Sequence, residues 1–240
     1  MATAHFHGAK MKKLGLIGGM SWSSSALYYK IINGNVARKM GGLHSAPLLM
    51  ESLDFAEIAR CTTANDWDCA ADRLIESAKR LEQAGAQGLV LCANSMHAVY
   101  DRIVEAISIP VLHVAEAVGE RMQADGVKTA ALVGTRNVMT EKFYRQCLVG
   151  HGVSLLPPDM ELAQQVDEIV YDELVLGKAT RSAERLMKTA LTDIAKENVE
   201  AVVLACTELQ MIVDVRANVL PIYDSTSIHA RAAVDFILAN

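Results

Sequence analysis

Short apolar runs alternate with longer amphipathic stretches along most of the 240-residue chain. Continuous runs of Leu, Val and other apolar residues are typical of buried parallel strands. The predicted strands are Leu14 to Gly18, Leu48 to Leu53, Gly88 to Ala93, Val111 to Val114, Ala130 to Gly134 and Ala201 to Cys206. Helical spacing of apolar residues marks the stretches between them. The predicted helices are Ser23 to Lys39, Trp67 to Ala84, Met96 to Ile107, Ala115 to Asp125, Glu141 to Gly150, Met160 to Val175, Ser182 to Glu197 and Ser227 to Leu238.

The sequence pattern indicates that one unit occurs twice along the chain. The segment from Gly85 to Asn94 aligns without gaps on the segment from Asn198 to Thr207. Upstream of each, Leu14 to Met20 corresponds to Ala130 to Arg136. Two matched segments in the same order are the signature of an internal duplication. Two βα units of any α/β protein also look alike, so chance similarity is the alternative interpretation.

The spacing within the two copies supports the duplication. Gly18 precedes Ala93 by 75 positions, and Gly134 precedes Cys206 by 72. The alternation of strands and helices predicts an α/β fold, so the repeat predicts two Rossmann-like parallel-sheet halves related by pseudo-two-fold symmetry. Each half would have about 100 residues, an ordinary domain size. The stretch after Pro221 is expected outside the second copy.

Domain boundaries follow from this repeat. The first half is predicted over 12–114 and the second over 115–224. A final helix over 225–240 is expected to pack back on the first half. Residues 1–10 contain no apolar signal segment and are expected to form a disordered extension before Met11.

Composition and charge narrow the class of protein. At 51% hydrophobic residues the chain has ample apolar material for a buried core. A formal charge of −5 without a long basic run favours neither nucleic acid nor an anionic membrane surface as a partner. The apolar runs are far shorter than the roughly 20 residues of a membrane span. We therefore expect a cytoplasmic enzyme that acts on a small molecule.

The cysteines are five in number and form no CxxC pair. In a chain of this size, which needs no disulfide to hold a core, this pattern predicts free thiols. Four of them are expected to be small buried hydrophobic residues. These are Cys61, Cys69, Cys92 and Cys147.

Cys206 differs from the other cysteines because it ends a predicted strand, directly before Thr207, Glu208 and a helix start. Backbone amides at that start would favour its thiolate. A thiol of ordinary pKa, about 8.5, could give or take a proton at an amino acid's α-carbon. Ligands of such sheets bind outside the carboxyl ends of the strands, so the repeat would place Ala93 opposite Cys206 across a cleft. A structural cysteine in a buried strand is the alternative.

Short polar residues follow several predicted strands, at the expected mouth of the cleft. Hydroxyl and amide groups, with free amides of helix starts, could bind a substrate carboxylate. The same residue types are also preferred helix N-caps, and this second role stays open. The residues are Asn94, Ser95, Thr135, Thr140 and Thr207.

The turn Gly18-Gly19-Met20-Ser21 follows the first strand. Its glycines could let a ligand approach the backbone closely, so we assign Gly19, Met20 and Ser21 to substrate binding. The turn does not match GxGxxG, which argues against a nucleotide.

Further titratable residues lie near predicted helix starts. His97 and His229 could carry a proton or orient a neighbour, although structural hydrogen bonding is the competing role. Glu208 and Asp224 could polarise a thiol or bind an ammonium group, or they could only complement a helix dipole. No spacing matches a zinc site, a P-loop or a Ser-His-Asp order, so no metal is predicted.

Taken together, these motifs resemble the aspartate/glutamate racemases, most closely the enterobacterial aspartate/glutamate racemase subgroup. The resemblance runs from about Lys12 to the C-terminus. It is carried by Leu16 to Trp22, Gly42 to Ala46, Asn94 to His97, Gly134 to Arg136, Ala205 to Glu208 and Asp224 to His229. It implies an isomerase without pyridoxal phosphate, a pair of cysteines flanking the substrate α-carbon, and a homodimer.

The chain departs from that family at two positions. Ala93 stands where the family usually has cysteine and the subgroup can have threonine, and alanine cannot transfer a proton. The adjacent Cys92 could replace it only if the strand end twists, because consecutive strand residues point to opposite faces. Gln165 falls where some aspartate racemases use a basic residue for the distal carboxylate.

The leading hypothesis is an amino-acid racemase of the aspartate/glutamate type, with Cys206 as acid and base and Ala93 at its partner's position. Two alternatives remain from the same residues. One is a decarboxylase, because protonating one face of a carbanion needs only one thiol. The other is a non-catalytic protein that binds small carboxylates.

Overall fold

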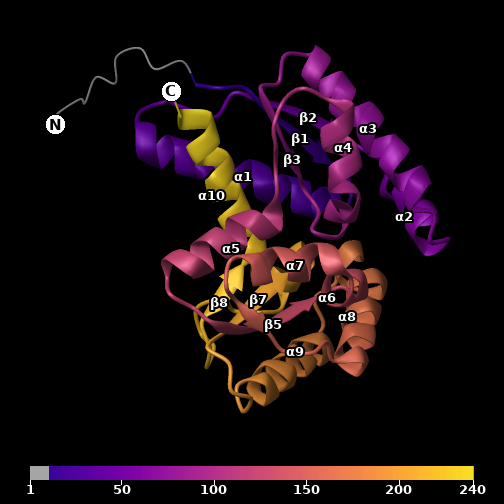
Figure 1. Ribbon diagram of the computed structural model, residues 1–240, viewed down its shortest axis with the longest axis vertical. Coiled ribbons are helices and arrows are strands. Elements are labelled where there is room, and N and C mark those ends of the chain that lie inside the picture. The colour runs from indigo at the N-terminus through magenta and orange to yellow at the C-terminus, as the bar shows by residue number, and fades with distance from the viewer. Residues whose placement is uncertain (1–10, 240) are drawn as a thin grey trace. The chain divides into compact units, whose positions relative to one another are not determined.

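The computed structural model describes residues 11–239, in which two parallel four-stranded sheets are each flanked by helices (Figure 1). By packing, the chain divides into two units. Unit 1 comprises 11–92, 101–112 and 230–239, and unit 2 comprises 93–100 and 113–229. The segment 93–100 thus groups with unit 2, whereas the repeat had assigned it to the first half. The extension predicted over 1–10 lies outside the described residues.

The sheet of unit 1 has the strand order β2-β1-β3-β4. All neighbouring strands are parallel. The strands are β1 (Leu14–Gly18), β2 (Leu48–Ser52), β3 (Gly88–Leu91) and β4 (Val111–Leu112).

The sheet of unit 2 has the equivalent order, β6-β5-β7-β8, and is also parallel. The strands are β5 (Thr129–Gly134), β6 (Ser154–Leu155), β7 (Ala201–Ala205) and β8 (Ile222–Asp224). In register, Leu14 pairs with Gly88 and Ala130 pairs with Ala201, the positions that the sequence repeat aligns. The prediction of two Rossmann-like halves is confirmed.

The second copy extends further along the chain than the repeat predicted. The stretch after Pro221 was expected outside the second copy, but β8 pairs with β7 as β4 pairs with β3. Strands β6 and β8 were not predicted because two or three residues are too few to show a period.

The helices of unit 1 bury opposite faces of its sheet. Apolar residues of α1 and α10 pack with Leu14, Leu16 and Val90 in one cluster. Helix α3 packs against β1 and β2. The helices of this part of the chain are α1 (Trp22–Met40), α2 (Phe55–Thr63), α3 (Trp67–Gln83), α4 (Tyr100–Ala106) and α10 (Ser225–Leu238), of which residues 230–238 belong to unit 1.

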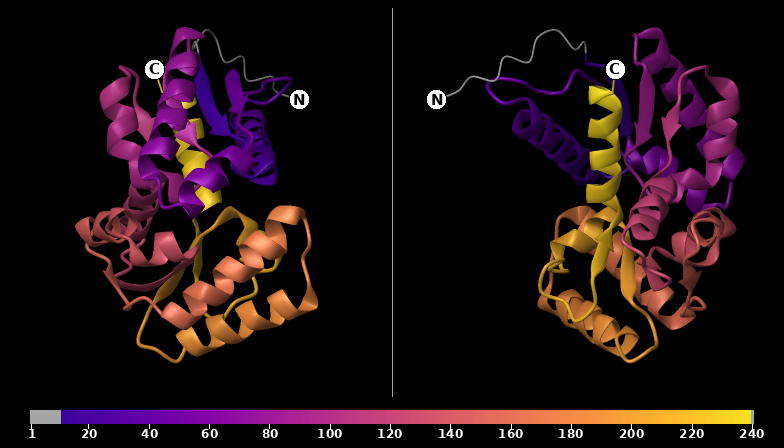
Figure 2. Two further views of the ribbon diagram at one scale, coloured as in Figure 1. Left: turned by 90° about the vertical axis from the view of Figure 1, so that its right-hand side faces the viewer. Right: turned by 60° about the vertical axis from the view of Figure 1, so that its left-hand side comes forward.

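In unit 2, side chains alternate between two apolar clusters along β5. Ala131 and Val133 face α8 and α9, whereas Ala130 and Leu132 face α5 and α7. Helices α8 and α9 contribute to the same apolar cluster and lie side by side in the left view of Figure 2. The helices are α5 (Val114–Ala124), α6 (Arg136–Thr140), α7 (Lys142–Gly150), α8 (Met160–Asp172) and α9 (Arg181–Ile194). Three short 3₁₀ helices are η1 (Ser95–Val99), η2 (Leu174–Leu176) and η3 (Thr207–Met211).

Side-chain caps fix where several helices begin. The acceptor oxygens of Asp54, Asp66, Asp159 and Thr180 bind backbone amides in the first turn of α2, α3, α8 and α9. Such caps satisfy amides that have no partner within the helix. Helix α2 was nevertheless missed, because its nine residues were read as part of a connection.

The prediction of five free thiols is wrong for two of them. Cys61 of α2 and Cys69 of α3 form a disulfide, eight positions apart. The turn between the two helices brings them together, which sequence spacing alone did not indicate. Within 11–239, no helix combines the length and apolar character that crossing a membrane requires.

Candidate active site

Cys206 directly follows β7 and is 5% exposed. Its Sγ donates a hydrogen bond to Oε2 of Glu208 over 3.2 Å. The same carboxylate oxygen accepts a hydrogen bond from Oγ1 of Thr207 at 3.0 Å. Thr207 and Glu208 are buried as well. A strand end thus holds a thiol, a hydroxyl and a carboxylate within one hydrogen-bonded group.

The electrostatics of this group favour the neutral thiol. Burial, and then the carboxylate of Glu208, raise the pKa of Cys206 well above its ordinary value. The backbone amides of Glu208 and Leu209 act in the opposite direction but weigh less. The amides of the helix start thus favour the thiolate, as expected, but burial and Glu208 outweigh them. The helix that follows is the five-residue 3₁₀ helix η3, whose few aligned peptide dipoles do not outweigh burial.

Ala93 occupies the strand end of β3 that is equivalent to Cys206, and its methyl group cannot transfer a proton. Next to it, Asn94 is 5% exposed, and both polar atoms of its side chain lack a hydrogen-bond partner. The side chain makes no cap hydrogen bond to η1, which begins at the half-buried Ser95. A buried amide without partners is costly, so it is a strong candidate to bind a ligand.

The remaining predicted hydroxyl groups differ in what they bind. Thr140 donates to the backbone oxygen of Arg136 at 2.9 Å, a bond along its own helix. Thr207 donates to Glu208, as described. Thr135 precedes α6 and is buried, yet its side chain makes no cap hydrogen bond. Thr135 therefore keeps its side chain available for another role, and Thr140 does not.

His97 joins the end of β3 to the start of α5. Its Nδ1 donates to the backbone oxygen of Ala93 at 3.0 Å, and its Nε2 accepts from the amide of Val114 at 3.2 Å. Burial lowers the pKa of His97 well below its ordinary value, and the nearby His113 and His229 lower it further. Both ring nitrogens of a neutral imidazole are thus occupied, which supports the structural role.

The structure also brings predicted and unpredicted aromatic residues together around His97. The ring of His229 lies 5.6 Å from that of His97 between centroids, in an edge-on arrangement. The ring of His113 lies at 4.8 Å, and its Nδ1 caps α5 by accepting from the amide of Ala115. His113 was missed because its capping role depends on where α5 begins.

Neighbouring residues of the chain itself fill the space beside the turn after β1. Gly19 has a φ of +82°, and a Cβ there would overlap the backbone oxygen of Leu53. Its amide donates to Oγ of Ser25 at 2.8 Å. Ser21 has a φ of +88°, and its Oγ lies 2.7 Å from that of Ser23. Packing within the chain thus explains why position 19 is a glycine. Met20 beside it is buried.

Cys92 and Gln165 do not belong to the hydrogen-bonded group that contains Cys206. Cys92 belongs to the apolar cluster with Leu14 and Val90, beneath α1 and α10, and burial raises the pKa of Cys92. Gln165 lines a cavity of about 560 Å³ formed by β5, α8 and α9 with the segment after β6. The lining of that cavity contains none of the other predicted site residues.

Two neighbours of this site were missed from the sequence. Burial, with the nearby acidic groups Asp167, Cys206 and Glu208, raises the pKa of Tyr171 to about 12. Nε2 of Gln210 donates to Oδ1 of Asp224 at 2.7 Å. Tyr171 lies on α8, and only the packing of that helix brings it toward the end of β7.

Comparison with known proteins agrees with the fold described above. Residues 17–233 match the family described as Asp/Glu/hydantoin racemase. The chain belongs to this family. It is an amino-acid racemase by class, and hence an isomerase.

Three members of this group of racemases illustrate the likeness. A candidate Asp/Glu racemase from Yersinia pestis is 38% identical, with a TM-score of 0.87 over 95% of this chain and 100% of that one. An aspartate racemase homologue from Pyrococcus horikoshii is 29% identical, with a TM-score of 0.79 over 95% and 99%. The broad specificity amino-acid racemase RacX of Bacillus subtilis is 26% identical over 72% of this chain and 75% of its own.

Proposed function

We propose that this protein exchanges the α-proton of an acidic amino acid, aspartate or glutamate, through the thiol of Cys206 and without pyridoxal phosphate. The observation that carries the proposal is the pair of equivalent strand ends. One holds Cys206 in a hydrogen bond to Glu208, and the other holds Ala93. The unpartnered amide of Asn94 supports a carboxylate or ammonium ligand at the same site.

Glu208 gives Cys206 a way to change its protonation state. The Sγ proton already points at the carboxylate, so transfer to Oε2 yields a thiolate and a neutral carboxylic acid. The thiolate then takes the α-proton, which leaves a carbanion and a thiol. The thiol proton exchanges with solvent, and its return to the same face of the carbanion restores the amino acid without change of configuration. The regenerated thiolate then takes back the proton held by Glu208, which completes the cycle. Reversal of configuration needs a proton from the other face.

Ala93 therefore separates two reactions that a two-thiol racemase couples. We expect exchange of the α-proton with solvent to be faster than inversion. Water reaching the second face would supply the slower inversion. We do not assign this role to Cys92, because its thiol is buried in the apolar cluster of unit 1.

The test is incubation with L-aspartate and L-glutamate in heavy water, with α-deuterium and enantiomer ratio measured together. We expect α-deuterium uptake in at least one substrate, ahead of the D-enantiomer. Cys206→Ser should abolish the uptake, and Cys92→Ser should retain it. Ala93→Cys should raise inversion relative to exchange, because it places a thiol at the equivalent strand end.

The alternatives have their own outcomes in the same experiment. No uptake by the folded protein would contradict the proposal. Decarboxylation of malonate-type acids without uptake into amino acids would favour the single-thiol decarboxylase. Thermal stabilisation by small carboxylates with neither reaction would favour a binding protein. Uptake that survives Cys206→Ser would remove this thiol from the mechanism.

Three expectations about the protein's setting accompany this proposal. A homodimer, a cytoplasmic location and the absence of nucleic-acid and membrane partners stay predictions. Analytical ultracentrifugation of the purified protein would test the dimer directly. The assignment of Gln165 to the distal carboxylate also stays a prediction, and its position in a separate cavity lends it no support.

A further inference from the structure

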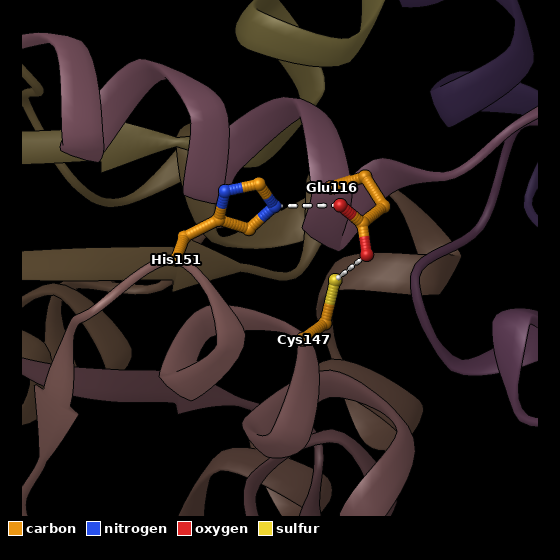
Figure 3. Close-up of side chains that lie close together, drawn as sticks. All are labelled: Glu116, Cys147 and His151. Carbon is orange, nitrogen blue, oxygen red and sulfur yellow. Dashed lines mark hydrogen bonds and ion pairs between the residues drawn. The ribbon is translucent and has the colours of Figure 1, made fainter.

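A cluster outside the candidate active site joins two helices of unit 2. Glu116 lies on α5, Cys147 lies on α7, and His151 directly follows α7 (Figure 3). Sγ of Cys147 lies 2.8 Å from Oε1 of Glu116, and Nε2 of His151 lies 2.6 Å from Oε2. The three donor atoms all lie within 4.8 Å of one another.

The neighbouring helix is shaped to receive the histidine. A Cβ at Gly119 of α5 would overlap the ring of His151, so the missing side chain makes the room that the imidazole fills. Glycine within a helix costs about 1 kcal/mol relative to alanine, which needs a compensating reason. Nδ1 of His151 lies 3.4 Å from Oε1 of Gln123. Contact at this second nitrogen turns Nε2 toward Glu116, as outer-shell partners do for metal-binding histidines.

We propose that Glu116, Cys147 and His151 form a binding site for Zn²⁺ or a chemically similar transition-metal ion. Thiolate, imidazole and carboxylate are the ligands that zinc prefers, whereas calcium and magnesium select oxygen alone. Zinc ligands lie about 2.0 to 2.3 Å from the ion, which sets tetrahedral donors roughly 3.5 Å apart. The cluster needs only small side-chain movements to reach that spacing. Water would complete the coordination.

Hydrogen bonds link the three side chains of the cluster. One proton lies between Sγ of Cys147 and Oε1 of Glu116, and the 2.6 Å contact of His151 requires another. Binding would release the thiol proton of Cys147 to solvent and leave a thiolate, a carboxylate and an imidazole whose Nε2 carries no proton as ligands. The side chains of Glu116 and His151 are 53% and 18% exposed, so an ion can enter from solvent. A bound ion would link α5 to α7 and stabilise unit 2.

The experiment is titration of the full chain with Co²⁺, with Zn²⁺ as competitor. We expect a near-ultraviolet thiolate-to-cobalt absorption band, lost on adding Zn²⁺, and a rise in thermal stability with Zn²⁺ that a chelator reverses. The band is the deciding signal because His5 and His7 of the sequence could bind cobalt without it. Neither readout uses racemase activity, so failure of the proposed function leaves this test intact.

Variants locate the site. Cys147→Ser should remove the band, and His151→Gln should weaken cobalt binding by more than the roughly 10- to 100-fold that loss of an outer-shell partner costs, because it removes a ligand. Gly119→Ala should weaken binding without removing a ligand, because it displaces the ring. Cys206→Ser and Glu120→Gln are the matched controls and should keep the band. A band that survives Cys147→Ser, a band lost with Cys206→Ser, or no thiolate band at millimolar cobalt in the folded protein would overturn the proposal.

Discussion

Single residues decide what chemistry each strand end can perform. Cys206 and Ala93 occupy equivalent positions in the repeat, yet one carries a thiol and the other a methyl group. Glu208, two residues after Cys206, both raises the pKa of the thiol and offers it an acceptor. Glu208 was predicted as a candidate because of its position near the thiol. The direction of the pKa shift was predicted wrongly, because burial is a property of the fold.

Gly19 is the residue whose replacement tests the closed turn after β1. Gly19→Ala should lower the free energy of unfolding by about 2–4 kcal/mol, because it adds both left-handed strain and overlap with Leu53. Gly152→Ala is the control, since Gly152 has a similar φ of +81° but open space around a Cβ. Its cost should be only about 1 kcal/mol. Equal losses of unfolding free energy for the two variants in urea would show that packing against Leu53 contributes nothing to stability.

At the scale of elements, connections between secondary structures hold the candidate active site in place. His97 binds the backbone at the end of β3 with one nitrogen and the start of α5 with the other. This arrangement needs the neutral ring, because a proton on Nε2 would repel the amide of Val114. The disulfide between Cys61 and Cys69 similarly joins α2 to α3 in unit 1.

The neutral state of His97 predicts a pH dependence of stability. The folded state keeps the pKa of His97 well below its ordinary value, whereas the unfolded chain binds a proton near pH 6.5. Stability should therefore fall as the pH drops below about 6.5, by up to about 1.4 kcal/mol per pH unit from this residue. Urea unfolding at pH values between 7.5 and 5.5, which bracket the ordinary histidine pKa, measures this dependence of stability on pH. His97→Gln should flatten the slope, and the exposed His44→Gln should leave it unchanged.

At the scale of the whole molecule, the final helix belongs to both units. Residues 225–229 of α10 group with unit 2, whereas Ala233, Val234 and Ile237 complete the apolar cluster of unit 1. The first sheet thus depends on the last residues of the chain. The sequence predicted a final helix that packs back on the first half, but its local pattern did not show that residues 225–229 group with unit 2.

Ile237 tests that dependence. Ile237→Ala should destabilise unit 1 by about 2–5 kcal/mol, the usual cost of deleting a buried aliphatic side chain. Trp22 and Trp67 both lie in unit 1, so tryptophan fluorescence during urea unfolding reports on it. Asp235→Ala is the control, because it breaks only the exposed ion pair with Lys39 and should cost less than about 1 kcal/mol. An unchanged midpoint for Ile237→Ala would mean that α10 contributes little to unit 1.

The sequence by itself determined six of the eight parallel strands described over 11–239, most helices, the two equivalent halves and the position of Cys206 after a strand. These follow from apolar periodicity and from short-range order, which are readable over a few residues. Only the tertiary structure decided that Glu208 binds the thiol, that His97 bridges β3 and α5, and that Cys61 pairs with Cys69. The physical reason is that hydrogen-bond partners, burial and the resulting pKa shifts depend on how segments distant in sequence pack together.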